Sequence, residues 1–97
     1  MVSALIGNNG TTNTEITIYP NPVEGKEFTM RFSNKIGKYN VVILNAEGKK
    51  VFNDNITVGS LDVQKRFVLP QTMGAGKYNV IIIGNDGVKQ QIPIIVL

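Results

Sequence analysis

The chain has 97 residues, a net charge of +3, and no cysteine, histidine or tryptophan. A domain of this length buries about two thirds of its unfolded surface, and 42% hydrophobic residues can supply one core without disulfides. The missing thiols and imidazoles exclude thiolate metal sites, thiol nucleophiles and the usual general base, so we expect no enzyme and no cofactor.

Residues 1–14 are predicted to form a linker or a disordered lead-in to one domain that spans 15–97. The stretch 7–14, GNNGTTNT, is uncharged and built from small polar residues, and the segment 1–6 is either an added remnant or the end of a preceding domain. No apolar run approaches the ~20 residues of a membrane-spanning helix, and the short opening lacks the basic residues of a secretory signal. We therefore expect no membrane span, and either a cytoplasmic protein or a piece cut from a longer chain.

Two alternating segments open the domain. Glu15 to Tyr19 has the period of a half-buried strand, and Pro20-Asn21-Pro22 is predicted to end it, because each proline fixes its own φ and restricts the residue before it. After a turn at Glu24-Gly25, the segment 27–33 alternates again. Its inward side chains are predicted to be Phe28, Met30 and Phe32.

A repeat of two copies follows. Gly37 to Lys50 reads GKYNVVILNAEGKK, and Gly76 to Lys89, 39 residues later, reads GKYNVIIIGNDGVK. An acidic residue and a glycine between two β-rich runs is typical of a hairpin, since glycine adopts the positive φ of a tight turn. Both faces of Tyr39–Leu44 are apolar, which predicts a strand in the middle of a sheet or under a covering loop.

The remaining segments complete an all-β pattern. Val63 to Leu69 alternates up to Pro70, and the last run, Val88–Leu97, contains Pro93, which places it at a sheet edge or a bulge. Six or seven short strands without any helical period predict an immunoglobulin-like antiparallel β-sandwich of about seven strands.

Tyr78 and the final six residues are the most informative details of this pattern. Tyr78 opens the sixth strand two residues after Gly76, the place of the tyrosine corner, in which the phenol hydroxyl bonds to backbone a few residues upstream; simple packing is the alternative. The segment Ile92–Leu97 is uncharged and almost wholly apolar. It is either a last strand buried on one face and protected by Pro93, or an edge that a partner recognises by strand addition.

The charged residues give no sign of catalysis or nucleic-acid binding. Six of the seven carboxylates fall in or beside turns or at strand ends, and the alternating acids of a calcium loop are absent. The ten basic residues are scattered in runs of at most two, which suits turns and strand edges better than a phosphate-tracking stripe.

Three stretches, taken in order, resemble one known family. They are ITIYPNPVEGKEFTMRF (Ile16–Phe32), GKYNVVILNAEGKKVF (Gly37–Phe52), and MGAGKYNVIIIGNDG with the final β-run (Met73–Leu97). This set is similar to the type A C-terminal sorting domains of the type IX secretion system of Gram-negative bacteria. No single motif is specific, but the order, spacing and position of the set are fairly specific.

The resemblance implies a secretion signal at the end of a large exported cargo protein. Such domains are immunoglobulin-like sandwiches that direct the cargo from the periplasm through an outer-membrane translocon, and a sortase-like peptidase then commonly removes them. The cargo is secreted or attached to surface lipopolysaccharide. By the motif match, the implied signal elements are Pro20, Asn21, Pro22, Gly76, Tyr78, Ile92, Pro93, Ile94, Ile95, Val96 and Leu97.

One departure from the family pattern and two other functions stay open. Many relatives carry a lysine or arginine close to the terminus, whereas this chain ends IPIIVL, which leaves the detail of terminal recognition open. A carbohydrate- or surface-binding module and a passive fibronectin-like spacer use the same scaffold, and fold alone does not separate the three functions.

Overall fold

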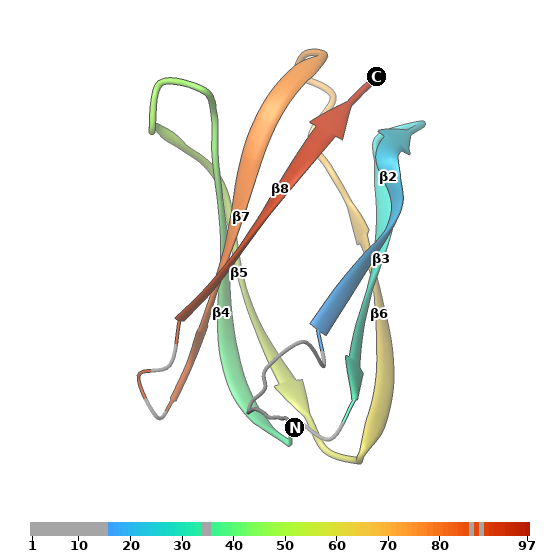
Figure 1. The fold of residues 1–97 in the computed structure, drawn as a ribbon, viewed down its shortest axis with the longest axis vertical. Coiled ribbons are helices and arrows are strands. Elements are labelled where there is room, and N and C mark those ends of the chain that lie inside the picture. Colours follow the sequence, from blue (N-terminus) through green and yellow to red (C-terminus); the bar gives the residue numbers. More distant parts are fainter. Residues whose placement is uncertain (1–15, 34–35, 86, 88) are drawn as a thin grey trace, which may run out of the picture.

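The computed structural model describes residues 16–33, 36–85, 87 and 89–97. Within these ranges the chain forms seven strands and no helix (Figure 1). The predicted lead-in 1–14, and the boundary at residue 15, lie outside the described residues. The strands are β2 (Ile16–Glu24), β3 (Glu27–Ser33), β4 (Gly37–Leu44), β5 (Lys50–Val58), β6 (Asp62–Val68), β7 (Gly76–Gly84) and β8 (Lys89–Val96).

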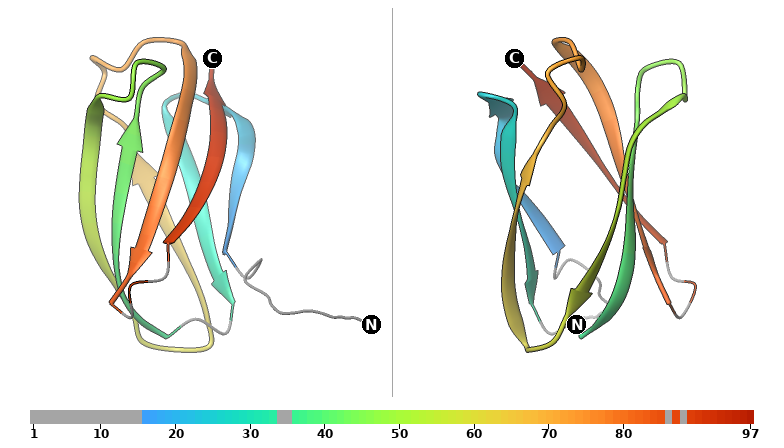
Figure 2. Two further views of the ribbon diagram at one scale, coloured as in Figure 1. Left: turned by 60° about the vertical axis from the view of Figure 1, so that its left-hand side comes forward. Right: turned by 180° about the vertical axis from the view of Figure 1, so that it is seen from behind.

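The strands form two facing layers, as Figures 1 and 2 show, with β5, β4, β7 and β8 in one layer and β2, β3 and β6 in the other. The layers join where β2 meets β8: Val23 pairs with Val96 in parallel, and the amide of Leu97 donates to the carbonyl of Val23 at 3.0 Å. The other strand pairs are antiparallel. The predicted sandwich is therefore confirmed, with one short parallel contact added to it.

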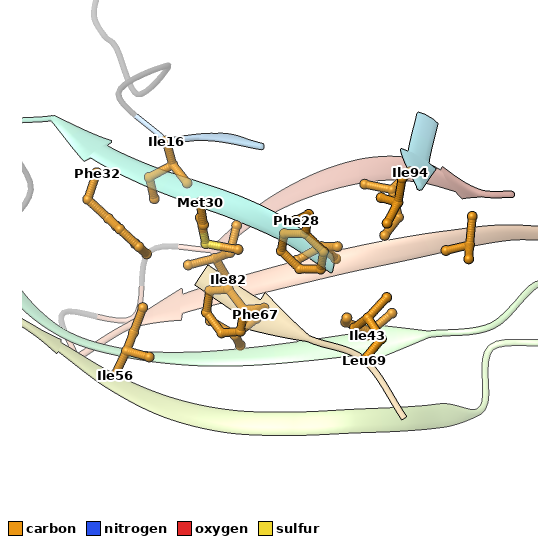
Figure 3. Packing of buried hydrophobic residues seen from close by; sticks show 14 of the residues in the cluster. Ile16, Phe28, Met30, Phe32, Ile43, Ile56, Phe67, Leu69, Ile82 and Ile94 are labelled. Carbon is orange, nitrogen blue, oxygen red and sulfur yellow. The ribbon is translucent and has the colours of Figure 1, made fainter. Parts of the chain in front are cut away.

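The core lies between the two layers and is built by the alternation of β3. Phe28, Met30 and Phe32 are at most 1% exposed, as the sequence pattern predicts. Phe28 stacks on Phe67 of β6 with ring centroids 5.2 Å apart (Figure 3). Phe52 of β5 meets the ring of Phe67 edge-on at 6.1 Å. Phe28 and Phe67 are buried, and each contributes roughly 1.5–3 kcal/mol by leaving water. The partly buried Phe52 brings the other sheet into contact with this pair.

The sequence repeat forms the two predicted hairpins, β4–β5 and β7–β8, which lie side by side in one sheet. In the β4–β7 ladder Val42 lies opposite Ile81, and these two residues hold the same position in the two copies. The turn glycines also match, since Gly48 has a φ of 84° and Gly87 a φ of 86°. The two hairpins are therefore related by a local two-fold axis between Val42 and Ile81.

β2 differs from the prediction, because Pro20-Asn21-Pro22 does not end the strand. Pro20 and Pro22 each follow a cis peptide bond, and the backbone continues as a strand to Glu24. The pairing with β3 is interrupted between Tyr19 and Glu24, as expected where prolines supply no N–H. Beyond the interruption, Val23 pairs with Val96 of β8 while Glu24 pairs again with Glu27 of β3, so the end of β2 bridges the two layers.

Candidate functional site

A groove of about 580 Å³ brings residues of the Pro-Asn-Pro stretch together with the last strand. Five of the residues singled out from the sequence line it: Asn21, Tyr78, Pro93, Ile94 and Ile95. Three further residues, which the sequence analysis did not single out, complete the lining: Ala46, Lys77 and Asn79. Sequence positions up to 74 apart thus contribute to one surface.

Asn21 fixes the position of β2 against β8. Its Nδ2 donates to the carbonyl oxygen of Pro93 at 3.1 Å, and its Oδ1 accepts from the amide of Ile95 at 3.2 Å. A primary amide offers one acceptor and two donors, so a single side chain can imitate one peptide group of a neighbouring strand. The Asn21 side chain therefore supplies the hydrogen bonds between β2 and β8 where the backbones of the two strands do not pair.

The backbone groups of Pro93 point away from β7, toward β2. Alternate residues of an antiparallel strand direct their backbone groups to opposite neighbours, and the amides of Ile95 and Leu97 both point toward β2. Pro93 lies in the same alternation, so the ladder with β7 loses no hydrogen bond to its missing N–H. The position has the edge character that the sequence predicts, although β8 is not a terminal strand of the sheet.

The last strand divides its side chains between core and surface. Ile94 and Val96 are each 1% exposed, whereas Ile95 is 43% exposed and Leu97 is 59% exposed. Ile92 is half-buried and packs against the core cluster. The prediction of a last strand buried on one face is therefore confirmed, and recognition of its exposed face by a partner stays a prediction.

Tyr78 makes the predicted corner. Its hydroxyl donates to the carbonyl oxygen of Gly74 at 2.7 Å, four residues upstream. Gly76, between them, has a φ of 152° and pairs with Val96 of β8. The other predicted signal residues do not line the groove itself. Five of them flank it in the same strands, and Leu97 follows the end of β8; the five are Pro20, Pro22, Gly76, Ile92 and Val96.

The groove offers groups that could bind a partner. It combines one cationic side chain, Lys77, with the amide of Asn79 and the apolar surface of Pro93 and Ile95. Across the described ranges, no cluster of three or more carboxylates or other ligating side chains is placed to hold a metal ion. Nor does that part of the chain contain a helix long and apolar enough to cross a bilayer.

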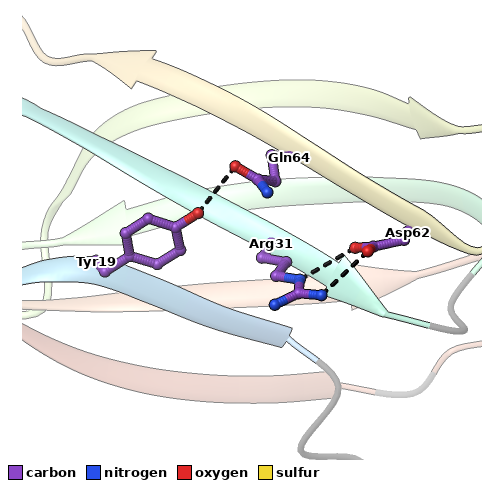
Figure 4. Close-up of polar contacts among 4 residues, drawn as sticks. All are labelled: Tyr19, Arg31, Asp62 and Gln64. Carbon is purple, nitrogen blue, oxygen red and sulfur yellow. Dashed lines mark hydrogen bonds and ion pairs between the residues drawn. The ribbon is translucent and has the colours of Figure 1, made fainter.

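On the outer face of the opposite sheet, polar side chains pair with one another. Arg31 pairs with Asp62 through two hydrogen bonds of 3.0 Å, and the hydroxyl of Tyr19 donates to Gln64 at 2.9 Å (Figure 4). The hydrogen bond from Arg31 lowers the pKa of Asp62, and the same contact raises the pKa of Arg31. Among the described aromatic residues, Tyr19 is the most exposed, at 43% of its surface.

The family model of the secretion system C-terminal sorting domain matches residues 17–96. The chain belongs to this family. It is a C-terminal sorting signal, and the role of the family is to direct a larger cargo across the outer membrane, toward the cell surface or the medium, by the type IX secretion system. The matched range covers the seven described strands except Ile16, the first residue of β2, and it includes the groove and the Asn21 contact.

A solved structure supports the fold of the sorting domain. PorZ, an essential bacterial surface component of the type-IX secretion system of Porphyromonas gingivalis, is similar over 84% of this chain, with a TM-score of 0.58 and 15% sequence identity. The matched region is 11% of the PorZ chain, so the likeness concerns one domain of a much longer protein. No curated protein matches the chain.

Proposed function

We propose that proteins of the secretion machinery recognise the sorting domain at the groove between Asn21 and the last strand. The observation that carries this proposal is the pair of hydrogen bonds from Asn21 to Pro93 and Ile95, which joins two separate signal elements into one surface. The exposed Ile95 and the cationic Lys77 give a partner both apolar contact and charge within the same groove. Pro20, Pro22, Gly76 and Tyr78 hold this surface in shape.

The proposed partners are the outer-membrane translocon and a sortase-like peptidase, with the cargo linked covalently on the N-terminal side. Membership of the sorting family supports this assignment. In this proposal the domain performs no reaction of its own and passes through the periplasm on its way to the surface. Recognition, removal and release are steps carried out by other proteins.

The test uses a reporter fused in front of the full chain in a host that has the type IX secretion system. Ile95→Asp places a charge on the exposed side of β8 without entering the core, because the Ile95 side chain is 43% exposed. Val68→Asp is the matched control, since Val68 is 59% exposed and lies on β6 in the opposite sheet. We expect reporter in the medium or on the surface for the control, and retention in the periplasm for Ile95→Asp.

Two results would end the proposal. If the unaltered fusion stays in the periplasm, the chain is not a functional sorting signal in that host. If Ile95→Asp and Asn21→Ala are both exported as well as Val68→Asp, a partner does not read this groove. Thermal unfolding of the purified variants shows whether any retention reflects an unfolded domain.

A further inference from the structure

The outer face of the sheet β5-β4-β7-β8 has a composition unlike that of the opposite sheet. Val41 and Ile43 of β4, Val80 and Ile82 of β7, and Ile94 and Val96 of β8 point into the core, so the residues between them point outward. We call this outward surface the lysine face. Its members are Lys38, Asn40, Val42, Leu44, Lys50, Asn53, Asn55, Thr57, Lys77, Asn79, Ile81, Ile83, Lys89, Gln91, Pro93 and Ile95.

The centre of the lysine face is apolar. Ile81 is only 9% exposed, yet it is not part of the core cluster, because its neighbours on the outer face shield it. Val42 lies directly opposite Ile81, and Leu44 and Ile83 continue the apolar area along their strands. Amide side chains of Asn40, Asn53, Asn55, Asn79 and Gln91 surround this centre. Such a surface can bury apolar area while its rim makes hydrogen bonds.

The charges of the lysine face are all positive. Each of its four strands begins with a lysine at the first or second residue: Lys38, Lys50, Lys77 and Lys89. Because neighbouring strands are antiparallel, Lys38 and Lys89 lie at one end of the face, and Lys50 and Lys77 lie at the other. No carboxylate occupies an outward position of these strands. The two ends are roughly 20 Å apart, six residues at about 3.3 Å each.

The opposite sheet shows that this arrangement is specific to one side. Both ion pairs found among the described residues lie on it, Arg31 with Asp62 and Arg66 with Glu27. Its outer face therefore balances two positive charges with two negative ones. On the lysine face, by contrast, the described residues form no ion pair, although Glu47 of the β4–β5 turn lines a small hollow together with Lys77.

The local two-fold axis gives the lysine face a second hollow. This hollow, of about 330 Å³, contains Lys38, Tyr39 and Asn40, which correspond to Lys77, Tyr78 and Asn79 in the groove. Asn85 takes the place of Ala46, and the facing strand supplies Asn55 and Thr57 where the groove has Pro93 and Ile95. A lysine and an asparagine are thus presented in the same way at both ends of the face.

We propose that the lysine face docks onto an acidic surface of a partner protein, with one acidic cluster meeting each pair of lysines. This inference rests on the proposed function and names the chemistry of the partner, since the groove at Asn21 forms one end of the face. Complementary charge steers association and selects partners, while the apolar centre around Val42 and Ile81 supplies the buried area. The amides between the lysines suit the peptide groups of a protein better than a lipid surface.

The test compares pairs of substitutions in the reporter fusion. Lys38→Gln with Lys77→Gln removes one charge from each end of the face, and Lys38→Arg with Lys77→Arg keeps both charges. The matched control, Lys65→Gln with Arg66→Gln, removes two positive charges from β6 in the opposite sheet. We expect export to fall roughly tenfold for the glutamine pair on the face, and to stay within about twofold for the other two pairs.

The outcomes separate this inference from the proposed function. Normal export of the Lys38→Gln and Lys77→Gln pair, with retention of Ile95→Asp, would overturn the acidic partner and leave the groove as the recognised site. Failure of the unaltered fusion would overturn the proposed function itself. Binding of the purified chain to phosphatidylglycerol vesicles that depends on Lys38 and Lys77 would assign the face to anionic lipid, and no such binding is expected.

Discussion

The hydroxyl of Tyr78 donates a 2.7 Å hydrogen bond to the carbonyl oxygen of Gly74, which links the loop before β7 to the beginning of that strand. A phenylalanine keeps the ring and removes only this bond. We expect Tyr78→Phe to lower the free energy of unfolding by about 1 kcal/mol, which corresponds to a drop in Tm of about 4–8 °C. Tyr19→Phe, which loses an exposed bond to Gln64, is the control and should cost less than about 0.5 kcal/mol.

Asn21→Ala removes both bonds between β2 and β8 and should lower the free energy of unfolding by about 1–2 kcal/mol. Asn21→Asp retains the acceptor for the amide of Ile95 but places a carboxylate against the carbonyl oxygen of Pro93. This variant should be least stable, relative to wild type, near neutral pH. It should recover in acid, where a protonated carboxyl can donate to Pro93, and urea unfolding at both pH values measures the difference.

Phe28→Ala should be severely destabilising, because Phe28 is 1% exposed and stacks on Phe67. Truncation of a buried phenylalanine costs about 3–5 kcal/mol, which is a large part of the total stability of a small domain. Loss of the cooperative transition in thermal unfolding would fit this expectation. Val68→Ala, at a position 59% exposed, should change Tm little, and an equal effect of the two substitutions would contradict the described core.

The repeat predicts that Gly48→Ala and Gly87→Ala behave alike. Both glycines have a positive φ, 84° and 86°, at the same position of the two hairpin turns. A residue with a Cβ pays about 1–2 kcal/mol in this conformation. Gly59→Ala is the control, since Gly59 has no positive φ and an added Cβ would meet open space. Chemical denaturation of the three variants should give two similar losses of stability and one near zero.

The Arg31–Asp62 contact predicts a pH-dependent contribution with a definite sign. Because the hydrogen bond from Arg31 lowers the pKa of folded Asp62, the contact stabilises the fold above the ordinary carboxyl pKa. The contribution is lost as the pH falls through the lowered pKa of the folded state. Asp62→Asn should therefore be less stable than wild type at neutral pH, by a small amount since both side chains are exposed, and equally stable in strong acid.

Local patterns were sufficient to predict the β-sandwich and most of its core. The alternation of Phe28, Met30 and Phe32 predicts one buried face correctly, because side-chain direction in a strand follows from position alone. The repeat predicts both hairpins, and the spacing of Gly76 and Tyr78 predicts the corner, since each signal lies within a few residues of the contact it forms.

Contacts between distant segments were not predictable in the same way. The partners of Asn21 lie 72 and 74 residues away, and Pro-Asn-Pro indicates a break in pairing without indicating where the chain goes next. The register shift beside Val51, where Ile43 faces Phe52 and Leu44 faces Lys50, occurs in one hairpin and not in its twin. Lys77 and Asn79 join the groove only through the order of strands in the sheet, which no local pattern specifies.

The contact between Val23 and Val96 determines when, during folding, a partner protein can bind the domain. It joins the first described strand to the last, so the pair can form only after all the strands between them have been synthesised. Non-local pairings of this kind form slowly, in milliseconds to seconds for all-β domains. A partly folded chain therefore lacks the surface around Asn21. A protein that binds this surface thereby selects domains that have completed folding.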